Sequence, residues 1–397
     1  METTPNANRK HIVFYGKTNS GKSSLLNHLV EQDVAIVSEK EGTTTDPVIK
    51  AMELIPVGPV VWVDTAGVQD QTELGRLRIK KTMDMLMRTD LAIYVMAAND
   101  IDIEAFNAFK LYFKKYAIPY VVVISQIDKV TPVELVHIQQ EFKESILTTI
   151  ADETSIIKLK EVIISKLEAE EEDKPLVGDL LPYGAKVILV VPIDSEAPKG
   201  RIILPQVQCI RDCLDHGIKS YVVRDTELEE ALKEMPDVDL VITDSQAFAK
   251  VSKIVPNTIK LTGFSLLMSR QKGDLDLFMK GIQKIKTLKP GDKVLILEGC
   301  THNVSHEDIG RVKIPKGLSK YVGGELEFTY IAGQDFPGNL SDYELVIHCG
   351  GCMLTRKTVC NRARICNEKG VPITNYGMVL AFLSGILERS YEIFKSN

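Results

Sequence analysis

The sequence predicts an α/β protein with mainly parallel sheets, divided into more than one domain. Short apolar runs alternate with amphipathic stretches along most of the chain, as strands alternate with crossover helices in such folds. The chain has 397 residues, more than one ordinary hydrophobic core accommodates. Apolar residues make up 44% and charged residues 26%, the composition of a globular protein.

Charge and hydropathy exclude several classes of protein. The net charge is -6 and no dense Lys/Arg tract occurs, so we expect no nucleic-acid partner. The longest apolar runs have the length of strands, and the N-terminal "METTPNANRK" lacks a signal-peptide core, so we expect a cytoplasmic protein without membrane contact. Seven Cys in such a chain favour metal ligands or reactive thiols over a disulfide framework.

The expected elements suggest three domains. In residues 1–172, "HIVFYG", "VVWVDTAG", "LAIYVMAA" and "YVVVISQID" read as strands separated by helices, and the charged run "KLEAEEEDKP" closes the domain. Residues 173–265 repeat the alternation without a phosphate loop or ligand cluster, which favours an assembly role. There Cys209 and Cys213 lie one helical turn apart, and core packing is favoured over a shared metal. Residues 266–397 carry two strands that each end in a Cys-bearing loop.

A phosphate loop lies between the first strand and the first helix. "GKTNSGKS", residues 16–23, fits G-x-x-x-x-G-K-[ST]. Backbone N–H groups of the loop and helix start cradle phosphates, Lys22 reaches the outer phosphates, and Ser23 binds Mg²⁺. The other nucleotide-contacting positions that we expect are Gly16, Asn19, Ser20, Gly21 and Ser24.

With these motifs, the first domain resembles translation-factor-like GTPases, particularly the branch of tRNA-modification and ribosome-assembly GTPases. The resemblance makes Thr44 in "EGTTTDP" the Mg²⁺-binding switch residue, and in "DTAG" makes Asp64 a Mg²⁺ partner and Gly67 the γ-phosphate sensor. Val68 stands where Ras-type enzymes orient water with Gln, so hydrolysis is expected to be slow. Asn19 implies stimulation by K⁺, as in potassium-activated relatives; its alternative role is to cap the loop.

The base-reading motif departs from this family. Where N-K-x-D is expected, the chain has Ser125, Gln126, Ile127 and Asp128. Asp128 can still accept hydrogen bonds from guanine, whereas the Asn contact and the Lys packing over the base are lost. We therefore expect weak GTP binding with a residual preference over ATP.

The third domain carries a C-x-H...H-C-x-x-C constellation formed by Cys300, His302, His348, Cys349 and Cys352. The glycines inside the C-x-x-C permit positive φ and let the thiolates converge. If the two strands are neighbours, all three Cys side chains can face one point at the carboxyl edge of the sheet. The residues alone leave an iron-sulfur cluster, a zinc site and a redox pair open. Cys360 and Cys366 are expected in the core.

Taken together, the three parts closely resemble the FeFe-hydrogenase maturation GTPases. The resemblance implies a P-loop GTPase domain followed by two further α/β domains, the middle one dimerising. It also implies a 4Fe-4S cluster held by Cys300, Cys349 and Cys352, and a homodimeric carrier that receives a di-iron precursor from two radical S-adenosylmethionine maturases and delivers it to apo-hydrogenase. The cofactors implied are GTP, Mg²⁺, K⁺ and the cluster.

Three thiolates would leave one iron with an exchangeable ligand, which suits a carrier. The candidates for this ligand are His302, His306, Glu307 and His348. Two other interpretations stay open: an RNA-modification or ribosome-assembly GTPase, and a zinc-stabilised regulatory GTPase without metallocluster transfer.

Overall fold

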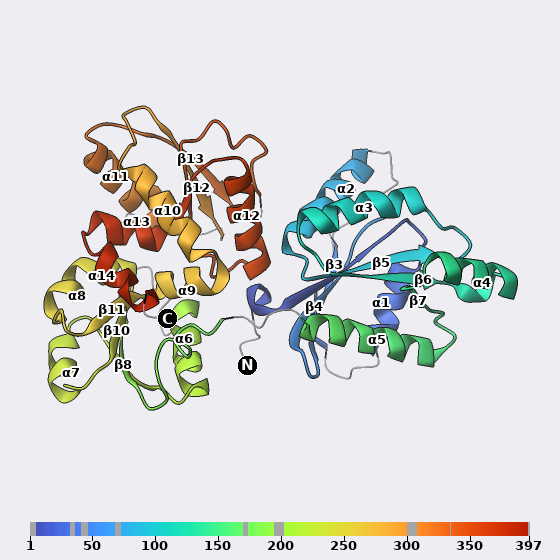
Figure 1. Ribbon diagram of the computed structural model, residues 1–397, viewed down its shortest axis with the longest axis horizontal. Coiled ribbons are helices and arrows are strands. Elements are labelled where there is room, and N and C mark those ends of the chain that lie inside the picture. The colour runs from blue at the N-terminus through green and yellow to red at the C-terminus, as the bar shows by residue number, and fades with distance from the viewer. Residues whose placement is uncertain are drawn as a thin grey trace. The chain divides into compact units, whose positions relative to one another are not determined.

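The computed structural model describes residues 5–31, 36–40, 47–67, 73–169, 174–193, 202–299, 308–333 and 335–395. The chain forms two compact units, Met1–Glu172 and Asp173–Asn397 (Figure 1). The division falls inside the charged run that the sequence marks as a boundary.

The first unit is built on a seven-stranded sheet in the order β2-β3-β4-β1-β5-β6-β7. Strands β4, β1, β5, β6 and β7 are parallel, and β3 is antiparallel to both β2 and β4. Two cores cover the two faces of the sheet, one contributed by α1 and α5 and the other by α2, α3 and α4. The elements are β1 Lys10–Tyr15, α1 Lys22–Glu31, β2 Ile36–Lys40, β3 Val48–Leu54, β4 Gly58–Asp64, α2 Glu73–Met85, β5 Leu91–Ala97, α3 Ile103–Lys115, β6 Tyr120–Ser125, α4 Pro132–Glu141, β7 Ile146–Leu147 and α5 Glu153–Glu168.

The second unit contains two parallel four-stranded sheets, β11-β10-β8-β9 and β13-β12-β14-β15. Both sheets have the same topology: the second strand lies on one side of the first, and the third lies on the other side. The strand order therefore reverses between β8 and β10, and again between β12 and β14, the positions where open α/β sheets bind ligands. The elements of the first sheet are β8 Lys186–Val190, α6 Leu204–Asp215, β9 Lys219–Val223, α7 Leu228–Glu234, β10 Leu240–Thr243, α8 Phe248–Ile254, β11 Lys260–Gly263 and α9 Phe264–Lys272.

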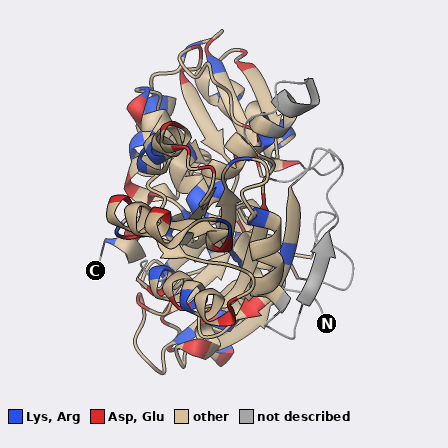
Figure 2. Ribbon diagram, turned by 90° about the vertical axis from the view of Figure 1, so that its right-hand side faces the viewer, with Lys and Arg blue, Asp and Glu red and all other residues tan. Residues whose placement is uncertain are grey.

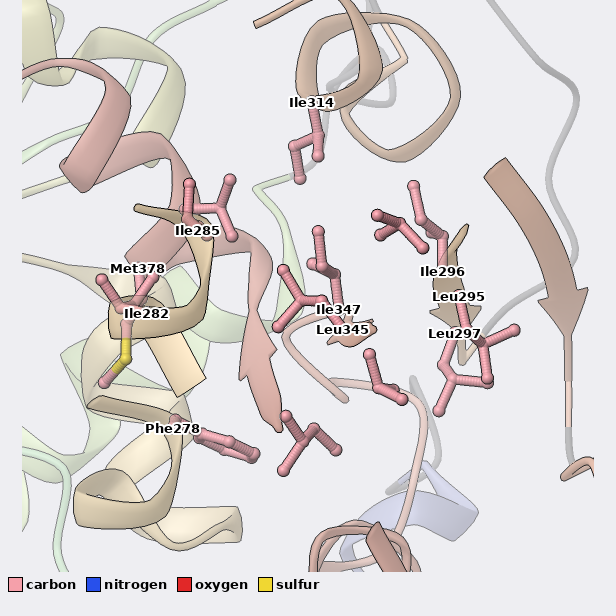
Figure 3. Close-up of a cluster of buried hydrophobic side chains, with 14 of the residues drawn as sticks. Phe278, Ile282, Ile285, Leu295, Ile296, Leu297, Ile314, Leu345, Ile347 and Met378 are labelled. Carbon is pink, nitrogen blue, oxygen red and sulfur yellow. The ribbon is translucent and has the colours of Figure 1, made fainter. Parts of the chain in front are cut away.

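The second sheet has a core of branched aliphatic side chains. Its elements are α10 Leu275–Ile285, β12 Lys293–Glu298, α11 Ile314–Val322, β13 Glu327–Ala332, β14 Leu345–His348, α12 Arg356–Glu368, β15 Ile373–Asn375, α13 Tyr376–Leu383 and α14 Leu387–Tyr391. Figure 3 shows Ile282 and Ile285 of α10 and Ile347 of β14 among these buried side chains. Because β12 and β14 are apolar on both faces, they are central strands covered by helices on both sides.

Helix α9 joins the two halves of the second unit. It follows β11 directly, and it packs against α6 of its own half and against α12 and α13 of the other half. The boundary expected after residue 265 therefore falls inside α9, and residues 173–397 form one compact unit with two sheets.

Charged residues of both signs are mixed along the helices and strand ends of the face that Figure 2 shows. This mixing agrees with the near balance of 48 Lys and Arg against 54 Asp and Glu. Across the described residues, every helix is too short or too polar to cross a bilayer.

Candidate functional site: a nucleotide pocket and a cysteine loop

The phosphate loop leaves β1 through a glycine that no other residue can replace without a clash. Gly16 has φ of +141°, and a Cβ at this position would lie 2.2 Å from the carbonyl oxygen of Val95 on β5. Asn19, at the bend of the loop, adopts a left-handed φ of 63°. Such a turn directs successive backbone N–H groups toward a common point, the arrangement that binds phosphate oxygens.

Lys22 lies inside the curve of the loop. Its Nζ donates to the carbonyl oxygen of Gly16 at 3.1 Å and to that of Lys17. Burial lowers the pKa of Lys22, and the carboxylate of Asp64 acts in the opposite direction. The ammonium group therefore stands at the centre of the loop, where the expected phosphates would bind.

Ser23 and Asp64 form the part of the site that fits Mg²⁺. Ser23 Oγ donates to Asp64 Oδ2, so the two oxygen ligands expected for the metal are adjacent. Asp64 Oδ1 is buried and has no hydrogen-bond partner within the described part of the chain. Burial raises the pKa of Asp64, and the contacts with Ser23 and Lys22 counteract this effect. A hard cation or its water ligand would satisfy this oxygen.

Gly67 contacts the phosphate loop directly. A Cβ on Gly67 would lie 2.2 Å from Oγ1 of Thr18, so only glycine allows this approach. The position suits the predicted role of Gly67 in sensing the γ-phosphate. Thr44 and Val68, the other two expected switch residues, lie outside the described residues.

The groups predicted to bind the nucleotide surround an open pocket of about 540 Å³, lined by Thr18, Asn19, Gly21, Lys22, Ser23, Ser24, Val48, Asp64, Thr65, Ala66, Gly67, Gln126 and Lys129. Ser20 is buried beneath the loop. A second cavity of about 200 Å³ extends toward Asp128 and Thr149. Thr149 Oγ1 donates to Asp128 Oδ1 at 2.7 Å, which lowers the pKa of Asp128 and keeps it ionised to receive N–H donors of a base.

The altered base motif still holds the phosphate loop. Ser125 Oγ donates to the carbonyl oxygen of Ser20 at 2.6 Å, and Gln126 Nε2 donates to that of Asn19 at 2.9 Å. The sequence showed the loss of the Asn and Lys side chains but gave no sign of these replacement contacts.

The cysteine loop, which carries Cys349 and Cys352, follows β14. The strand next to β14 is β12. The two strands are parallel, with Leu297 paired to His348. Beyond this pair, the Cys349 N–H donates to the Leu297 carbonyl oxygen at 2.8 Å, and the Gly299 N–H donates to Cys349 Sγ at 3.0 Å. The two strands are therefore neighbours, which is the condition under which the sequence analysis expects the Cys side chains to face one point. Cys300, which follows Gly299 directly, lies outside the described residues.

The sulfur of Cys349 lies against backbone N–H groups. It accepts from the N–H groups of Gly299 and of Gly351, the second at 3.4 Å. Backbone donors of this kind stabilise a negatively charged sulfur. Gly351 has a positive φ of 68°, which turns the chain between Cys349 and Cys352 as the sequence predicts.

His348 anchors the loop and does not offer a free ring nitrogen. Its Nδ1 lies 2.6 Å from the carbonyl oxygen of Cys349, and its Nε2 lies 3.2 Å from Nη1 of Arg362. Burial and the Arg362 charge lower the pKa of His348 to about 3, so the ring is neutral and Nε2 accepts. Of the ligand candidates from sequence, His348 has both ring nitrogens in contact with protein atoms, and His302, His306 and Glu307 lie outside the described residues.

Two buried cations fix the same loop. Lys272 is 5% exposed, and its Nζ donates to the carbonyl oxygens of Leu354 at 2.9 Å and Cys352 at 3.3 Å. Arg362 is fully buried on α12 and also donates to the carbonyl oxygen of Gly333 at 2.9 Å. Burial raises the pKa of Cys352, and the Lys272 charge opposes that effect. Sequence patterns gave no signal for either cation, because Lys and Arg on helices are usually solvated.

Within the described residues, no three His, Cys, Asp or Glu side chains come together as a metal site. Cys209 and Cys213 are fully buried in the core beneath β8, as expected for structural cysteines. Cys366 is likewise buried and Cys360 is half-buried. Arg311 donates hydrogen bonds to both carboxylate oxygens of Glu298. A cavity of about 220 Å³ adjoins the loop, and Gly350 and Cys352 form part of its wall.

Fold and sites define a P-loop nucleotide-binding protein whose second unit carries a cysteine loop at a sheet switch point. Three family models match the chain: "50S ribosome-binding GTPase" over residues 11–126, "Hydrogen maturase F dimerization domain" over 176–273 and "Hydrogen maturase F tetramerization domain" over 276–393. The chain belongs to the hydrogen maturase F family, the maturation GTPases of FeFe-hydrogenase.

The curated relatives are GTPases that match part of this chain. The tRNA modification GTPase MnmE of Caldicellulosiruptor saccharolyticus is 32% identical over 43% of this chain and 38% of its own length. The GTPase Era of a Thermoanaerobacter strain is 26% identical over 67% of this chain and 84% of its own length. A crystal structure of Aquifex aeolicus Era is similar at 17% identity and a TM-score of 0.32, covering 57% of this chain and 98% of that one. The chain thus spans less than half of the first relative.

Proposed function

We propose that this protein is a GTP-binding and GTP-hydrolysing carrier that holds a 4Fe-4S cluster and delivers a di-iron precursor to apo FeFe-hydrogenase. The observation that carries the proposal is the cysteine loop at the switch point of β12 and β14, on a chain of this family that also has a complete phosphate loop. A nucleotide site and a thiolate site on one chain suit a carrier whose binding to partners depends on nucleotide.

The cluster would be held by Cys300, Cys349 and Cys352. Two backbone N–H groups already point at Cys349 Sγ, and the donor next to Cys300 is one of them, which fits the donor set to an iron-sulfur cluster. The cluster supplies an iron with an exchangeable position. His302 or Glu307 would supply the fourth ligand of that iron, since both ring nitrogens of His348 contact other protein atoms.

In the nucleotide site, Lys22 would neutralise the phosphates, and Ser23 and Asp64 would hold Mg²⁺. Thr44 and Gly67 would respond to the γ-phosphate, and Asn19 would support K⁺ binding in place of an arginine finger. With Val68 unable to orient water, hydrolysis would be slow and regulatory. Hydrolysis rates measured in KCl and in NaCl test this assignment; equal rates in both salts would remove K⁺ from the proposal.

A homodimer would form through the first half of the second unit. Strand β9 is an edge strand of its sheet, and its Tyr221 and Val222 are 37% and 44% exposed. On the preceding helix α6, Val207 and Leu214 are 44% and 68% exposed. Exposed apolar side chains beside an unpaired strand edge are typical of a surface that a second chain covers. Sedimentation of the Leu214→Glu variant tests this, and an unchanged dimer would exclude the surface.

The delivery step is tested by transfer. The anaerobically loaded protein is incubated with apo-hydrogenase, and H₂ evolution is measured for the wild type and for Cys349→Ser. Activation by the wild type alone supports the carrier function. Equal activation by both proteins would overturn it.

Affinity for each of the two radical S-adenosylmethionine maturases, measured with and without GTP, tests the regulatory role of the nucleotide.

A further inference from the structure

The residues at the altered base motif form a chain of hydrogen bonds that ends on the phosphate loop. Lys129 Nζ donates to Gln126 Oε1 at 2.7 Å, and Gln126 Nε2 donates to the Asn19 carbonyl oxygen at 2.9 Å. Beside them, a Cβ on Gly21 would lie 3.3 Å from Gln126 Nε2. The side-chain amide of Gln126 is thus packed against the loop at two points.

A side-chain amide satisfies both ends of this chain, because it carries one acceptor oxygen and a donor nitrogen. The carbonyl oxygen of Asn19 can only accept a hydrogen bond, and the ammonium group of Lys129 can only donate one. A carboxylate at position 126 would pair with Lys129 but repel the Asn19 oxygen. An ammonium group there, as in N-K-x-D, would donate to Asn19 but repel Lys129. Gln126 and Lys129 therefore match each other as a pair.

The point of attachment is the strained bend of the loop. Asn19 has a left-handed φ of 63° and Gln126 itself has a φ of 57°. A left-handed conformation in a non-glycine residue needs support from its surroundings. The hydrogen bond from Gln126, which directly follows β6, supplies this support at the bend, in addition to the contact that Gly16 makes with Val95 on β5.

We propose that Gln126 is a positioning residue for the phosphate loop: it holds the bend at Asn19 in the phosphate-binding conformation, and Lys129 fixes the orientation of its amide. The proposal rests on the proposed nucleotide-binding function. It assigns the two halves of the altered motif different tasks. Ser125 and Gln126 hold the loop and contribute equally to every nucleotide, whereas Asp128, oriented by Thr149, reads the base.

The test is calorimetric titration of the full-length chain with GTP and, separately, ATP in the presence of Mg²⁺ and KCl. Gln126→Glu keeps the size of the side chain and its contact with Lys129 but removes the donor to Asn19. We expect GTP and ATP to bind about threefold to tenfold more weakly, both by the same factor. Gln139→Glu, the same change at an exposed position of α4, is the matched control and should bind as the wild type does.

A double variant at positions 126 and 129 separates the positioning role of Gln126 from a general loss of structure. Gln126→Lys combined with Lys129→Gln exchanges donor and acceptor and should restore both affinities to within about twofold of the wild type. Wild-type binding by Gln126→Glu would overturn the inference. A loss for GTP alone would also overturn it, because that result would make Gln126 a base-reading residue. A wild-type chain that binds neither nucleotide would overturn the proposed function itself.

Discussion

Arg362→Met should destabilise the second unit, because Arg362 is fully buried and connects three parts of the fold. Its guanidinium contacts His348 Nε2 at 3.2 Å and donates to the carbonyl oxygens of Gly333 at 2.9 Å and Asp335 at 3.1 Å. The Met side chain fills a similar volume and makes none of these hydrogen bonds. The change therefore tests the polar contacts with little change in packing.

The expected loss of stability depends on whether each hydrogen-bond acceptor of Arg362 can find another donor after the substitution. His348 is 1% exposed, so its Nε2 would stay unsatisfied at a cost of about 1–3 kcal/mol. Asp335 is exposed and Gly333 is half-buried, so water can replace the donor and each lost hydrogen bond costs about 0.5–1.5 kcal/mol. The sum is about 2–6 kcal/mol, and its midpoint of about 4 kcal/mol lowers the midpoint of thermal unfolding by roughly 12 °C for a unit of this size.

Thermal unfolding followed by circular dichroism, together with the rate of Cys349 alkylation, measures the effect. Arg364→Met on the same helix is the control, since Arg364 is half-buried and pairs with Glu368 at 3.8 Å across one helical turn. We expect a shift of no more than about 2 °C for the control. Equal shifts for the two variants, or no faster alkylation in Arg362→Met, would refute the assigned role of Arg362.

Three further predictions concern the two sites and the pH response. Gly16→Ala should weaken GTP binding about 100-fold, because its methyl group meets a β5 carbonyl oxygen 2.2 Å away; Gly58→Ala, with a positive φ but open space, should bind normally in the same titration. Gly299→Ala should lower bound iron, because its Cβ would lie 3.2 Å from the Cys349 sulfur, whereas Gly350→Ala meets no atom within 4 Å and should retain iron in the same assay. Burial and the Arg88 charge lower the pKa of His11 from 6.5 to about 4, so the neutral form is native. The contribution of His11 to the free energy of unfolding is fully present above pH 6.5. As the pH falls toward 4, this contribution decreases by up to about 3 kcal/mol. His11→Asn should flatten this dependence in denaturant titrations, and an unchanged slope would count against it.

The strands nearest the two sites were predictable from sequence, because buried parallel strands are continuous apolar runs. β1, β5, β6, β12 and β14 all lie where such runs occur. Strands β2 and β3 were not predicted, since they are antiparallel at the sheet edge and their polar residues interrupt the pattern. The phosphate loop and the C-x-x-C were recognisable because their chemistry requires fixed spacings.

The supporting contacts of both sites could not be predicted from sequence. Lys272 and Arg362 reach the cysteine loop from helices α9 and α12, across 82 and 14 residues of chain, and nothing local marks them as buried. His348 was one of four candidates for the exchangeable ligand, and only the fold shows that both of its ring nitrogens contact protein partners. Gln126 looked like a lost contact, although its amide reaches the loop 107 residues away. Contacts of this kind depend on tertiary structure.

The binding of a 4Fe-4S cluster by the cysteine loop can be tested by iron, sulfide and zinc analysis with EPR spectroscopy on protein prepared without oxygen. The comparison is between the wild type, Cys349→Ser and Cys360→Ser, the last a half-buried thiol on α12 outside the motif. We expect about four iron and four sulfide per chain with a reduced-cluster signal in the wild type and Cys360→Ser, and loss of that signal in Cys349→Ser. Stoichiometric zinc without iron, even after reconstitution, would contradict this expectation and leave a zinc-stabilised GTPase.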